Sequence, residues 1–201
     1  MRPDLNVVAD LIPSGARVLD LGCGDGALLD ELIRVRGCSG QGVEVSQDAF
    51  FACLGRGIPV VSADIDQGLP DFADGSFDVV VLSQTLQAVH RPALVIREMM
   101  RVARTGIVSF SNYGHVALRV RLLTRGRMPT SRMFPDPWFE TPAIRPCTLR
   151  DFDEFLAGQG VRPAGRVLLN SRGARADGLR SRAPNLLAAG AAYVIRADAE
   201  D

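Results

Sequence analysis

The sequence predicts an α/β fold: a doubly wound, mostly parallel sheet of seven strands with helices on both faces, within a single domain. Short β-branched and apolar runs alternate along the chain with segments of helical period, which is the pattern of a parallel sheet covered on both sides. The run Phe77–Leu82 is almost continuously apolar, as a central strand buried on both faces should be. The length of 201 residues suits one domain whose core needs no disulfide or metal.

The alternation also predicts the order of the elements. The expected strands are Arg17–Leu21, Gly40–Val45, Val60–Ser62, Phe77–Leu82, Ile107–Phe110, Arg166–Leu169 and Ala191–Ile195. The expected helices are Leu5–Ile12, Ala27–Val35, Gln47–Leu54, Pro92–Val102 and Asp151–Leu156. Pro13 stops the first helix, Pro92 takes a favoured first helical position, and Thr148 is a suitable N-cap for the last helix.

One domain is expected over residues 1–196, followed by a frayed acidic tail at 197–201. Inside the domain the alternation pauses at an insertion of about residues 129–147, which is rich in proline and aromatic residues. Residues 129–146 contain five of the 12 prolines and the only tryptophan, Trp138. This insertion separates the fifth strand from the last helix and the two closing strands.

The composition excludes several classes of protein. All 23 basic residues are arginine, so a Walker-type lysine, Schiff-base chemistry and the kinase strand lysine are excluded. The 23 acidic residues balance that charge, and a domain built to bind nucleic acid or an anionic membrane would carry a basic excess. No secretory leader or 18-residue apolar span is visible, which predicts a cytoplasmic protein with reduced thiols.

The cysteines do not indicate a metal or a nucleophile. Four cysteines and two histidines are present, without a C-x-x-C pair: Cys23, Cys38, Cys53, Cys147, His90 and His115. Such spacing is not typical of a zinc site, so no metal is expected. Cys147 and His115 would be the one catalytic pair to consider, but no nucleophile motif surrounds either residue, and lone cysteines are mostly core residues.

The most informative segment is a glycine turn, Gly22–Gly26, between the first strand and the following helix. Glycines at such a turn let a ligand approach the backbone at the N-terminus of a helix. Glu44 ends the second strand, where an acid can accept hydrogen bonds from both hydroxyls of a ribose. The turn and the acid together predict a nucleotide-like ligand.

Two such ligands compete. The spacing Gly22-x-Gly24-x-x-Ala27 formally satisfies the dinucleotide fingerprint. However, Asp20 and Asp25 flank the place where a pyrophosphate would lie, and two like charges at 4 Å repel by about 1 kcal/mol in water and about 4 kcal/mol at an effective dielectric constant of 20. A ligand with an ammonium and a sulfonium, such as S-adenosylmethionine, would gain from the same carboxylates.

A third acid matches the same molecule, because Asp64 can accept a hydrogen bond from the adenine amine while Ile65 offers an apolar face. The candidate residues for binding S-adenosylmethionine or S-adenosylhomocysteine are Asp20, Gly22, Cys23, Gly24, Gly26, Glu44, Val45, Asp64, Ile65 and Ser83. Over about residues 14–110, this ordered set resembles the class I S-adenosylmethionine-dependent methyltransferase fold.

A closer resemblance appears further along the chain. The segments that carry it are Ser83–Val89, Ile107–His115, Arg125–Pro129 and Cys147–Thr148. Together they resemble the methionine-biosynthesis protein MetW family, to about residue 160. The resemblance implies a methyltransferase-like fold that acts in methionine synthesis, with a homoserine O-acyltransferase as partner. The sequence departs from the family pattern at Ser111, where a proline is usual, and at Ala143–Pro146, where an Asn-Ile-His type of segment is usual.

The acceptor side gives fewer signals. Gln84 and Gln87 follow the fourth strand in place of the Asn/Asp-Pro-Pro-aromatic run of amino-group methylating enzymes. Both side chains can orient a substrate, but neither can take a proton. His90 could serve as a base, although a histidine beside Arg91 is more often a surface or cap residue. No catalytic residue is assigned, and a free-standing small-molecule methyltransferase remains the alternative function.

An arginine-rich segment and Trp138 are candidates for a partner surface. The arginines are Arg119, Arg121, Arg125 and Arg127, and they accompany Val116, Val120 and Leu123 at helical spacing. This pattern fits an amphipathic helix with a solvated basic face, or an interface, because interfaces favour Arg, Trp, Phe and Met. Trp138 is either an anchor of that interface or a filler of the core. A homodimer is also considered, whereas nucleic acid and membrane are not expected as partners.

Overall fold

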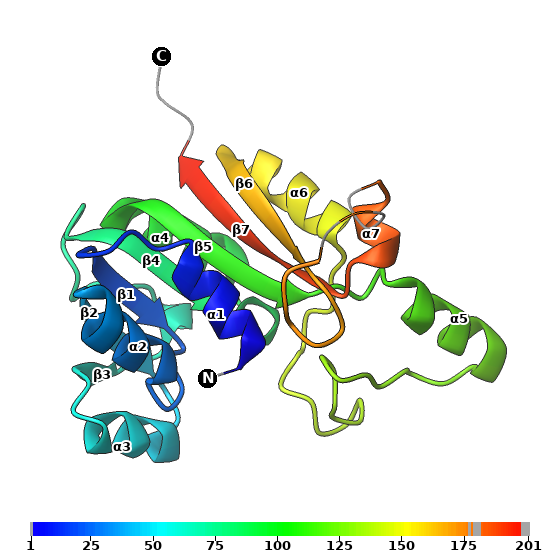
Figure 1. Cartoon of the computed structure of the whole chain (residues 1–201), viewed down its shortest axis with the longest axis horizontal. Coiled ribbons are helices and arrows are strands. Elements are labelled where there is room, and N and C mark those ends of the chain that lie inside the picture. Colours follow the sequence, from blue (N-terminus) through cyan, green and yellow to red (C-terminus); the bar gives the residue numbers. More distant parts are fainter. Residues whose placement is uncertain (1, 177, 179–181, 198–201) are drawn as a thin grey trace.

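The computed structural model describes residues 2–176, 178 and 182–197. Seven strands form one sheet in the order β3-β2-β1-β4-β5-β7-β6, with β7 antiparallel to both of its neighbours and the other strand pairs parallel (Figure 1). The strands are β1 (Arg17–Leu21), β2 (Ser39–Glu44), β3 (Val60–Ser62), β4 (Phe77–Ser83), β5 (Ala103–Ser111), β6 (Val161–Leu169) and β7 (Gly190–Ala197). The predicted fold class, a mostly parallel seven-stranded α/β sheet, is confirmed.

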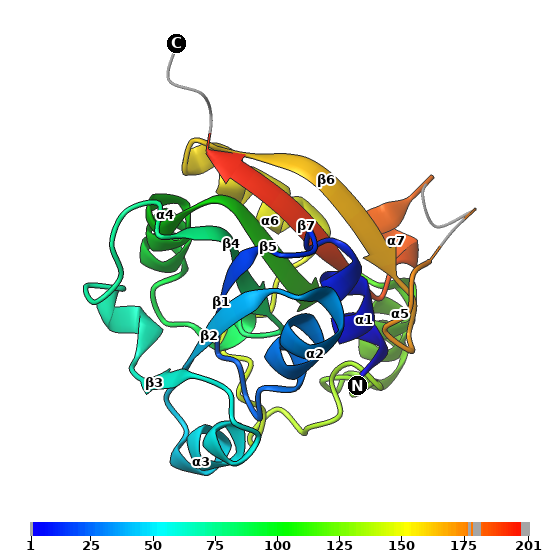
Figure 2. The ribbon, with the colours of Figure 1, turned by 60° about the vertical axis from the view of Figure 1, so that its left-hand side comes forward.

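Helices cover both faces of the sheet (Figure 2). They are α1 (Pro3–Asp10), α2 (Ala27–Arg36), α3 (Gln47–Gly55), α4 (Pro92–Val102), α5 (Val116–Arg125), α6 (Leu149–Gly158) and α7 (Pro184–Leu187), with short 3₁₀ turns η1 (Ile65–Gln67) and η2 (Leu86–Ala88). On β4, Val79 and Val81 pack with α1 and α2, whereas Val80 and Leu82 pack with α4 and α6. Burial on both faces explains the continuous apolar run of this strand.

Three strand boundaries differ by two or more residues from the sequence-based expectation. β5 begins at Ala103, directly after α4, and not at Ile107, because the backbone enters the sheet before the apolar residues begin. β6 begins at Val161 and not near Arg166; it is an edge strand, where Pro163 is tolerated at a register shift. Ala197 belongs to β7 and not to the acidic tail, and residues 198–201 of that tail lie outside the described residues.

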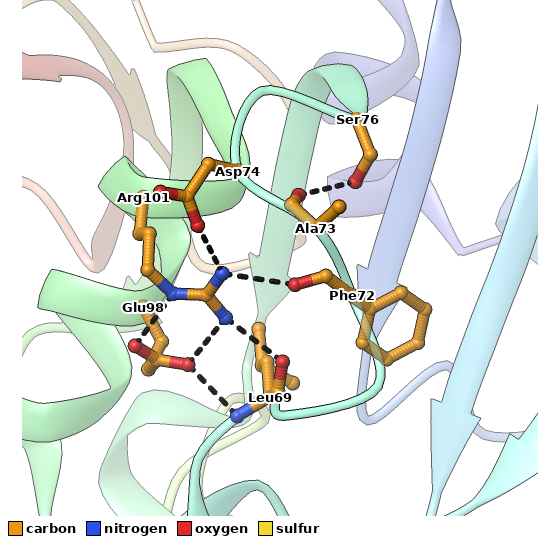
Figure 3. A network of polar contacts seen from close by, with 7 residues as sticks. All are labelled: Leu69, Phe72, Ala73, Asp74, Ser76, Glu98 and Arg101. Carbon is orange, nitrogen blue, oxygen red and sulfur yellow. Dashed lines mark hydrogen bonds and ion pairs between the residues drawn. The ribbon is translucent and has the colours of Figure 1, made fainter.

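An arginine on α4 fastens the segment between β3 and β4 to the body of the protein (Figure 3). The Arg101 guanidinium donates to the carbonyls of Leu69 (2.8 Å) and Phe72 (2.9 Å) and to the carboxylates of Asp74 (2.6 Å) and Glu98 (2.8 Å). Glu98 in turn accepts the Leu69 N–H at 2.9 Å, and its hydrogen bonds with Arg101 lower the pKa of the Glu98 carboxyl. This network holds the chain directly after η1.

The region after β5 leaves the sheet. Figure 1 shows α5 projecting from the body, with the yellow-green segment after it returning beneath β5. Of the residues in α5 only Leu118 is buried, so the predicted apolar spacing of Val120 and Leu123 faces solvent, with Leu123 87% exposed. Residues 126–148 contain no helix or strand. Phe134 anchors this segment by packing on Tyr113, with ring centroids 3.9 Å apart. Within the described residues, no helix is long and apolar enough to cross a membrane.

Candidate functional site

The glycine turn between β1 and α2 adopts a backbone that favours glycine. Gly22, Gly24 and Gly26 have φ angles of +70°, +58° and +75°. A Cβ at Gly22 would lie 2.7 Å from the Thr85 side chain, and one at Gly26 would lie 2.7 Å from the Cys53 sulfur. A Cβ at Gly24 would meet no atom within 4 Å, because Gly24 borders open space. Packing therefore requires glycine at Gly22 and Gly26, whereas Gly24 leaves space for a ligand.

Two cavities adjoin the turn at the carboxyl ends of the parallel strands. The glycine-loop cavity, of about 430 Å³, is lined by Asp20, Gly22, Cys23, Gly24 and Ser83 among others. The Glu44 cavity, of about 290 Å³, is lined by Gly22, Glu44, Val45, Asp64 and Ile65 among others. The two cavities share Gly22, Gln84 and Thr85. Nine of the ten predicted cofactor residues therefore line joined cavities, while Gly26 lies outside both and packs on α3.

Asp20 is the buried carboxyl of the glycine-loop cavity, with 3% of its surface exposed. Burial, and secondarily the nearby charge of Glu44, raises the pKa of Asp20 to about 7. Arg2 acts in the opposite direction and lines the same cavity. Because a cation favours the ionised carboxyl, a ligand ammonium or sulfonium in this cavity would offset the cost of that burial.

Glu44 connects the glycine turn to the end of β2. Its Oε2 accepts the Gly24 N–H at 2.8 Å, and its Oε1 accepts the N–H groups of Val45 and Ser46, both at 2.9 Å. A carboxylate offers about four acceptor positions, so Oε2 can still accept a bond from a ribose hydroxyl. Glu44 thus shapes the site in addition to its predicted role toward ribose.

Asp64 and Asp66 hold the backbone beside the Glu44 cavity through hydrogen bonds. Asp64 caps η1 by accepting the Asp66 N–H at 2.9 Å, and it remains exposed toward the cavity. Asp66 accepts the backbone N–H groups of His90 (2.9 Å) and Arg91 (2.6 Å), which start α4. His90 is exposed and lies outside the lining of both cavities, which agrees with a surface position and not with a general base.

Asp25 does not repel a dinucleotide pyrophosphate as strongly as the sequence predicts. Asp25 is exposed and forms an ion pair with Arg56 at 2.5 Å. Its charge is therefore offset, and the remaining negative groups beside the turn are Asp20 and Glu44. The sequence could not show this pairing, because Arg56 lies 31 positions away, at the end of α3.

The site also contains Arg2, which the sequence did not indicate, and Gln84, which was expected only on the acceptor side. Arg2, just before α1, lines the glycine-loop cavity and forms an ion pair with Asp4 at 3.5 Å. Gln84 is the one residue other than glycine with a positive φ, +58°, within the described part of the chain. Such a conformation costs energy and is concentrated at functional sites. Thr85, which was expected only as part of a family segment, fills the space above Gly22.

The two glutamines proposed for the acceptor side differ. Gln84 lines both cavities; its Oε1 accepts the Ser111 hydroxyl at 3.0 Å, while its buried Nε2 has no hydrogen-bond partner among the described residues. Gln87 is buried, and its Nε2 donates to the Ser111 carbonyl (3.1 Å) and to the Cys147 sulfur (3.6 Å). Gln87 therefore holds the insertion in place, whereas Gln84 keeps a donor available.

The structure does not support a catalytic role for the pair Cys147 and His115. Burial raises the pKa of the Cys147 thiol to about 11, so the reactive thiolate is scarce at neutral pH. His115 caps α5, where its Nδ1 accepts the Ala117 N–H at 3.2 Å. Among the described residues there is no cluster of three or more His, Cys, Asp or Glu side chains that could hold a metal ion.

The arginines proposed for a partner surface divide into two pairs. Arg119 donates to the Gly114 carbonyl at 2.6 Å and Arg121 to the Thr130 carbonyl at 2.5 Å, so both brace the projecting helix. Arg125 and Arg127 are exposed at its end. Trp138 is 72% exposed and packs edge-on against Phe139, which is itself 67% exposed. The suggestion that Trp138 fills the core is wrong.

Solved structures with the same arrangement include S-adenosylmethionine-dependent methyltransferases. One from Thermotoga maritima is 17% identical with a TM-score of 0.68, covering 96% of this chain and 87% of its own. One from Archaeoglobus fulgidus is also 17% identical with a TM-score of 0.68, covering 96% and 90%. The [4+2]-cyclase SpnF is 20% identical with a TM-score of 0.65, covering 96% and 80%. The fold is thus that of the class I S-adenosylmethionine-dependent methyltransferases.

The family is narrower than the fold. The chain belongs to the methionine biosynthesis protein MetW family, whose model matches residues 2–195. It is 39% identical over 167 residues to the bifunctional methionine biosynthesis protein MetXA/MetW of Rhodopirellula baltica, covering 79% of this chain. It is 30% identical over 115 residues to the ubiquinone biosynthesis O-methyltransferase of Methylococcus capsulatus, covering 55% of this chain. The matched regions span 27% and 48% of those two relatives.

Proposed function

We propose that this protein binds S-adenosylmethionine or S-adenosylhomocysteine and serves methionine biosynthesis as a partner or regulator of a homoserine O-acyltransferase. The observation that supports the ligand is that two cavities beside the glycine turn share Gly22 and Gln84 in their linings and that each contains a buried acid. Membership of the MetW family supports the pathway.

The residues are suited to each part of the ligand. Asp20 would face the ammonium of the methionine moiety. Glu44 would accept the ribose hydroxyls, while Asp64 and Ile65 would receive adenine. S-adenosylmethionine, when bound, supplies an electrophilic methyl group on its sulfonium. The open space beside Gly24 is the part of the turn that a ligand backbone or sugar can occupy.

Calorimetry with the full chain tests the ligand. S-adenosylmethionine and S-adenosylhomocysteine should bind, and NAD should bind at least about tenfold more weakly because its pyrophosphate would lie beside Asp20 and Glu44. Comparable affinity for NAD, or no binding of either S-adenosyl compound by the folded protein, would contradict the site assignment.

The partner is supported by the relative from Rhodopirellula baltica, whose description joins MetXA to MetW in one bifunctional protein. We infer from this description that the present chain contacts a homoserine O-acyltransferase. Co-expression with the homoserine O-acyltransferase of the same genome, followed by size-exclusion chromatography, should yield a stoichiometric complex. If the two proteins elute separately, with and without S-adenosylmethionine, the partner role fails.

A free-standing methyltransferase is the second candidate. The observation in its favour is a third cavity, larger than the other two, which Gln84 also lines. Methyl turnover on a metabolite extract, without any acyltransferase present, would favour this candidate. Its absence together with a stable complex favours the partner role.

A further inference from the structure

The third cavity lies under the insertion that follows α5. Its volume is about 780 Å³, within the usual range for small-molecule sites. Its walls come from five parts of the chain that lie far apart in the sequence: residues 2–4, residues 84–88, Ser111 at the end of β5, residues 132–143 and residues 171–173. Gln84 and Arg2 line both this cavity and the glycine-loop cavity, so the two cavities are neighbours.

The insertion is held firmly over this cavity. Arg145 donates to the carbonyls of Val89 (3.0 Å) and His90 (2.6 Å), and its own N–H bonds to the Gln87 carbonyl at 2.9 Å. Phe134 is buried at the other end of the segment. These attachments make the insertion a fixed wall of the cavity, at positions where the chain otherwise has no helix or strand.

Gln84, one of the residues that line the cavity, has a buried donor with no partner among the described residues. This donor is its Nε2, and a buried donor left unpaired is costly. The Ser111 hydroxyl holds the other amide atom, Oε1, at 3.0 Å. The strained backbone of Gln84 keeps the side chain in this place. A ligand oxygen would satisfy the donor.

The other polar groups favour an anion with a single charge. Three arginines line the cavity, but Arg2 is paired with Asp4. Arg132 and Arg172 form no salt bridge with any described residue, and they share the cavity with one further acid, Asp136. The three arginines and two aspartates that line the cavity therefore have a net charge of +1. Guanidinium groups bind carboxylates through two parallel hydrogen bonds.

The rest of the lining is apolar. Met133, Phe134, Pro135 and Pro142 contribute to the same walls. From this combination we propose that the cavity is a second ligand site, which binds a small organic carboxylate with an apolar body. The carboxylate lies between Arg132, Arg172 and the amide of Gln84, and the apolar body lies against the insertion. The site is separate from the cofactor cavities and does not require that S-adenosylmethionine occupy them.

Amide correlation spectra of the full chain, saturated with S-adenosylhomocysteine, provide the test. Benzoate, 4-methylpentanoate and hexanoate are added one at a time, and inorganic phosphate serves as the anion without an apolar body. At least one of the organic carboxylates should bind saturably with a dissociation constant in the millimolar range or tighter, and more tightly than phosphate. No saturable binding by any of the three, or equal binding by phosphate, overturns the proposal.

Three variants locate the binding. The double variant Arg132→Gln/Arg172→Gln should weaken carboxylate binding at least about tenfold, and Gln84→Glu should do the same by replacing a donor with a negative charge. The matched control, Arg104→Gln, removes an exposed arginine at the start of β5 and should bind as the parent does. Unchanged binding by the folded double variant overturns the site.

The outcome is distinguishable from a failure of the proposed function. Arg132 and Arg172 do not line the glycine-loop or Glu44 cavities, so the double variant should keep its affinity for S-adenosylhomocysteine. If S-adenosylhomocysteine does not bind at all, the proposed function fails, and the same titration of the ligand-free protein still decides whether the carboxylate site exists.

Discussion

Glu44 performs two tasks with one carboxylate, which makes its substitution informative. We expect Glu44→Gln to weaken binding of S-adenosylhomocysteine by about tenfold or more, because hydrogen bonds to a charged group contribute about 1.5–3 kcal/mol. The variant should also lose some thermal stability, since Glu44 accepts three backbone N–H groups. Calorimetry and a melting curve measure the two effects. Glu154→Gln, at an exposed position of α6, should change neither, and unaltered affinity in Glu44→Gln would refute the ribose assignment.

Asp20 should make ligand binding depend on pH. Its pKa is about 7 in the fold against an ordinary value of 3.8, so between these values the folded protein holds a proton that the unfolded chain has lost. The free energy of unfolding of the ligand-free protein should therefore fall as the pH rises through this window. A cationic ligand favours the ionised carboxyl, so binding should release a proton and strengthen as the pH rises toward 7.

Calorimetry at pH 6 in two buffers of different ionisation enthalpy measures the proton release. The affinity for the ligand can rise by at most about tenfold for each pH unit, since one pKa unit corresponds to about 1.4 kcal/mol. Asp20→Asn should bind more weakly and lose this slope. If that variant keeps the full pH dependence of the parent, another group is responsible.

At the scale of elements, Gly24 of the glycine turn can be compared with Gly37, which has a similar left-handed backbone. Gly24 and Gly37 have φ angles of +58° and +64°, and a Cβ at either would meet no atom within 4 Å. Each alanine substitution should therefore cost a similar 1–2 kcal/mol of stability, roughly, from the left-handed backbone alone. Only Gly24→Ala should abolish binding of S-adenosylhomocysteine, because its methyl group enters the cavity. Equal affinities in the two variants would place the ligand elsewhere.

The second element-scale prediction concerns the Arg101 network of Figure 3. Arg101→Met removes the donor shared by two carbonyls and two carboxylates, so we expect a loss of at least about 2 kcal/mol in the free energy of unfolding. Urea denaturation measures it, and Arg97→Met, at an exposed position of the same helix, is the control.

The same network predicts a pH effect of opposite sign to that of Asp20. Arg101 lowers the pKa of Glu98 below its ordinary value of 4.5, so the stabilisation is present above that value and is lost as the pH falls through the folded pKa. The stability difference between the parent and Arg101→Met should therefore shrink in acid. A difference that stays constant down to pH 3 would exclude Glu98 as the main partner.

At the scale of the whole molecule, the exposure of Trp138 predicts that this side chain contributes to partner binding and not to stability. Trp138 is 72% exposed, so Trp138→Ala should leave the melting temperature nearly unchanged. If the insertion docks on the acyltransferase, the same variant should weaken the complex by at least about 2 kcal/mol, which is about 30-fold. Phe51→Ala removes an equally exposed aromatic residue from α3, and the complex should tolerate it. A complex of undiminished affinity with Trp138→Ala would show that the partner binds another face.

The sequence by itself determined the layered α/β fold and most of the residues that line the two cavities beside the glycine turn. The reason is local: hydrophobic period and turn chemistry specify each strand and helix, and parallel strands bring their carboxyl ends to one edge. Asp20, Glu44 and Ser83 end β1, β2 and β4 or lie one position before the end, so they had to meet there. The same logic placed Thr148 as the N-cap of α6, where the structure shows a complete capping box with Asp151.

Only the tertiary structure decided what the segments without period do. It paired Asp25 with Arg56, turned Val120 and Leu123 of α5 to solvent and exposed Trp138. It also left the Nε2 of Gln84 without a hydrogen-bond partner among the described residues and built the third cavity from five distant segments. These features depend on contacts between residues far apart in the chain, and no local pattern specifies such contacts, because each segment makes them only when the others are already in place.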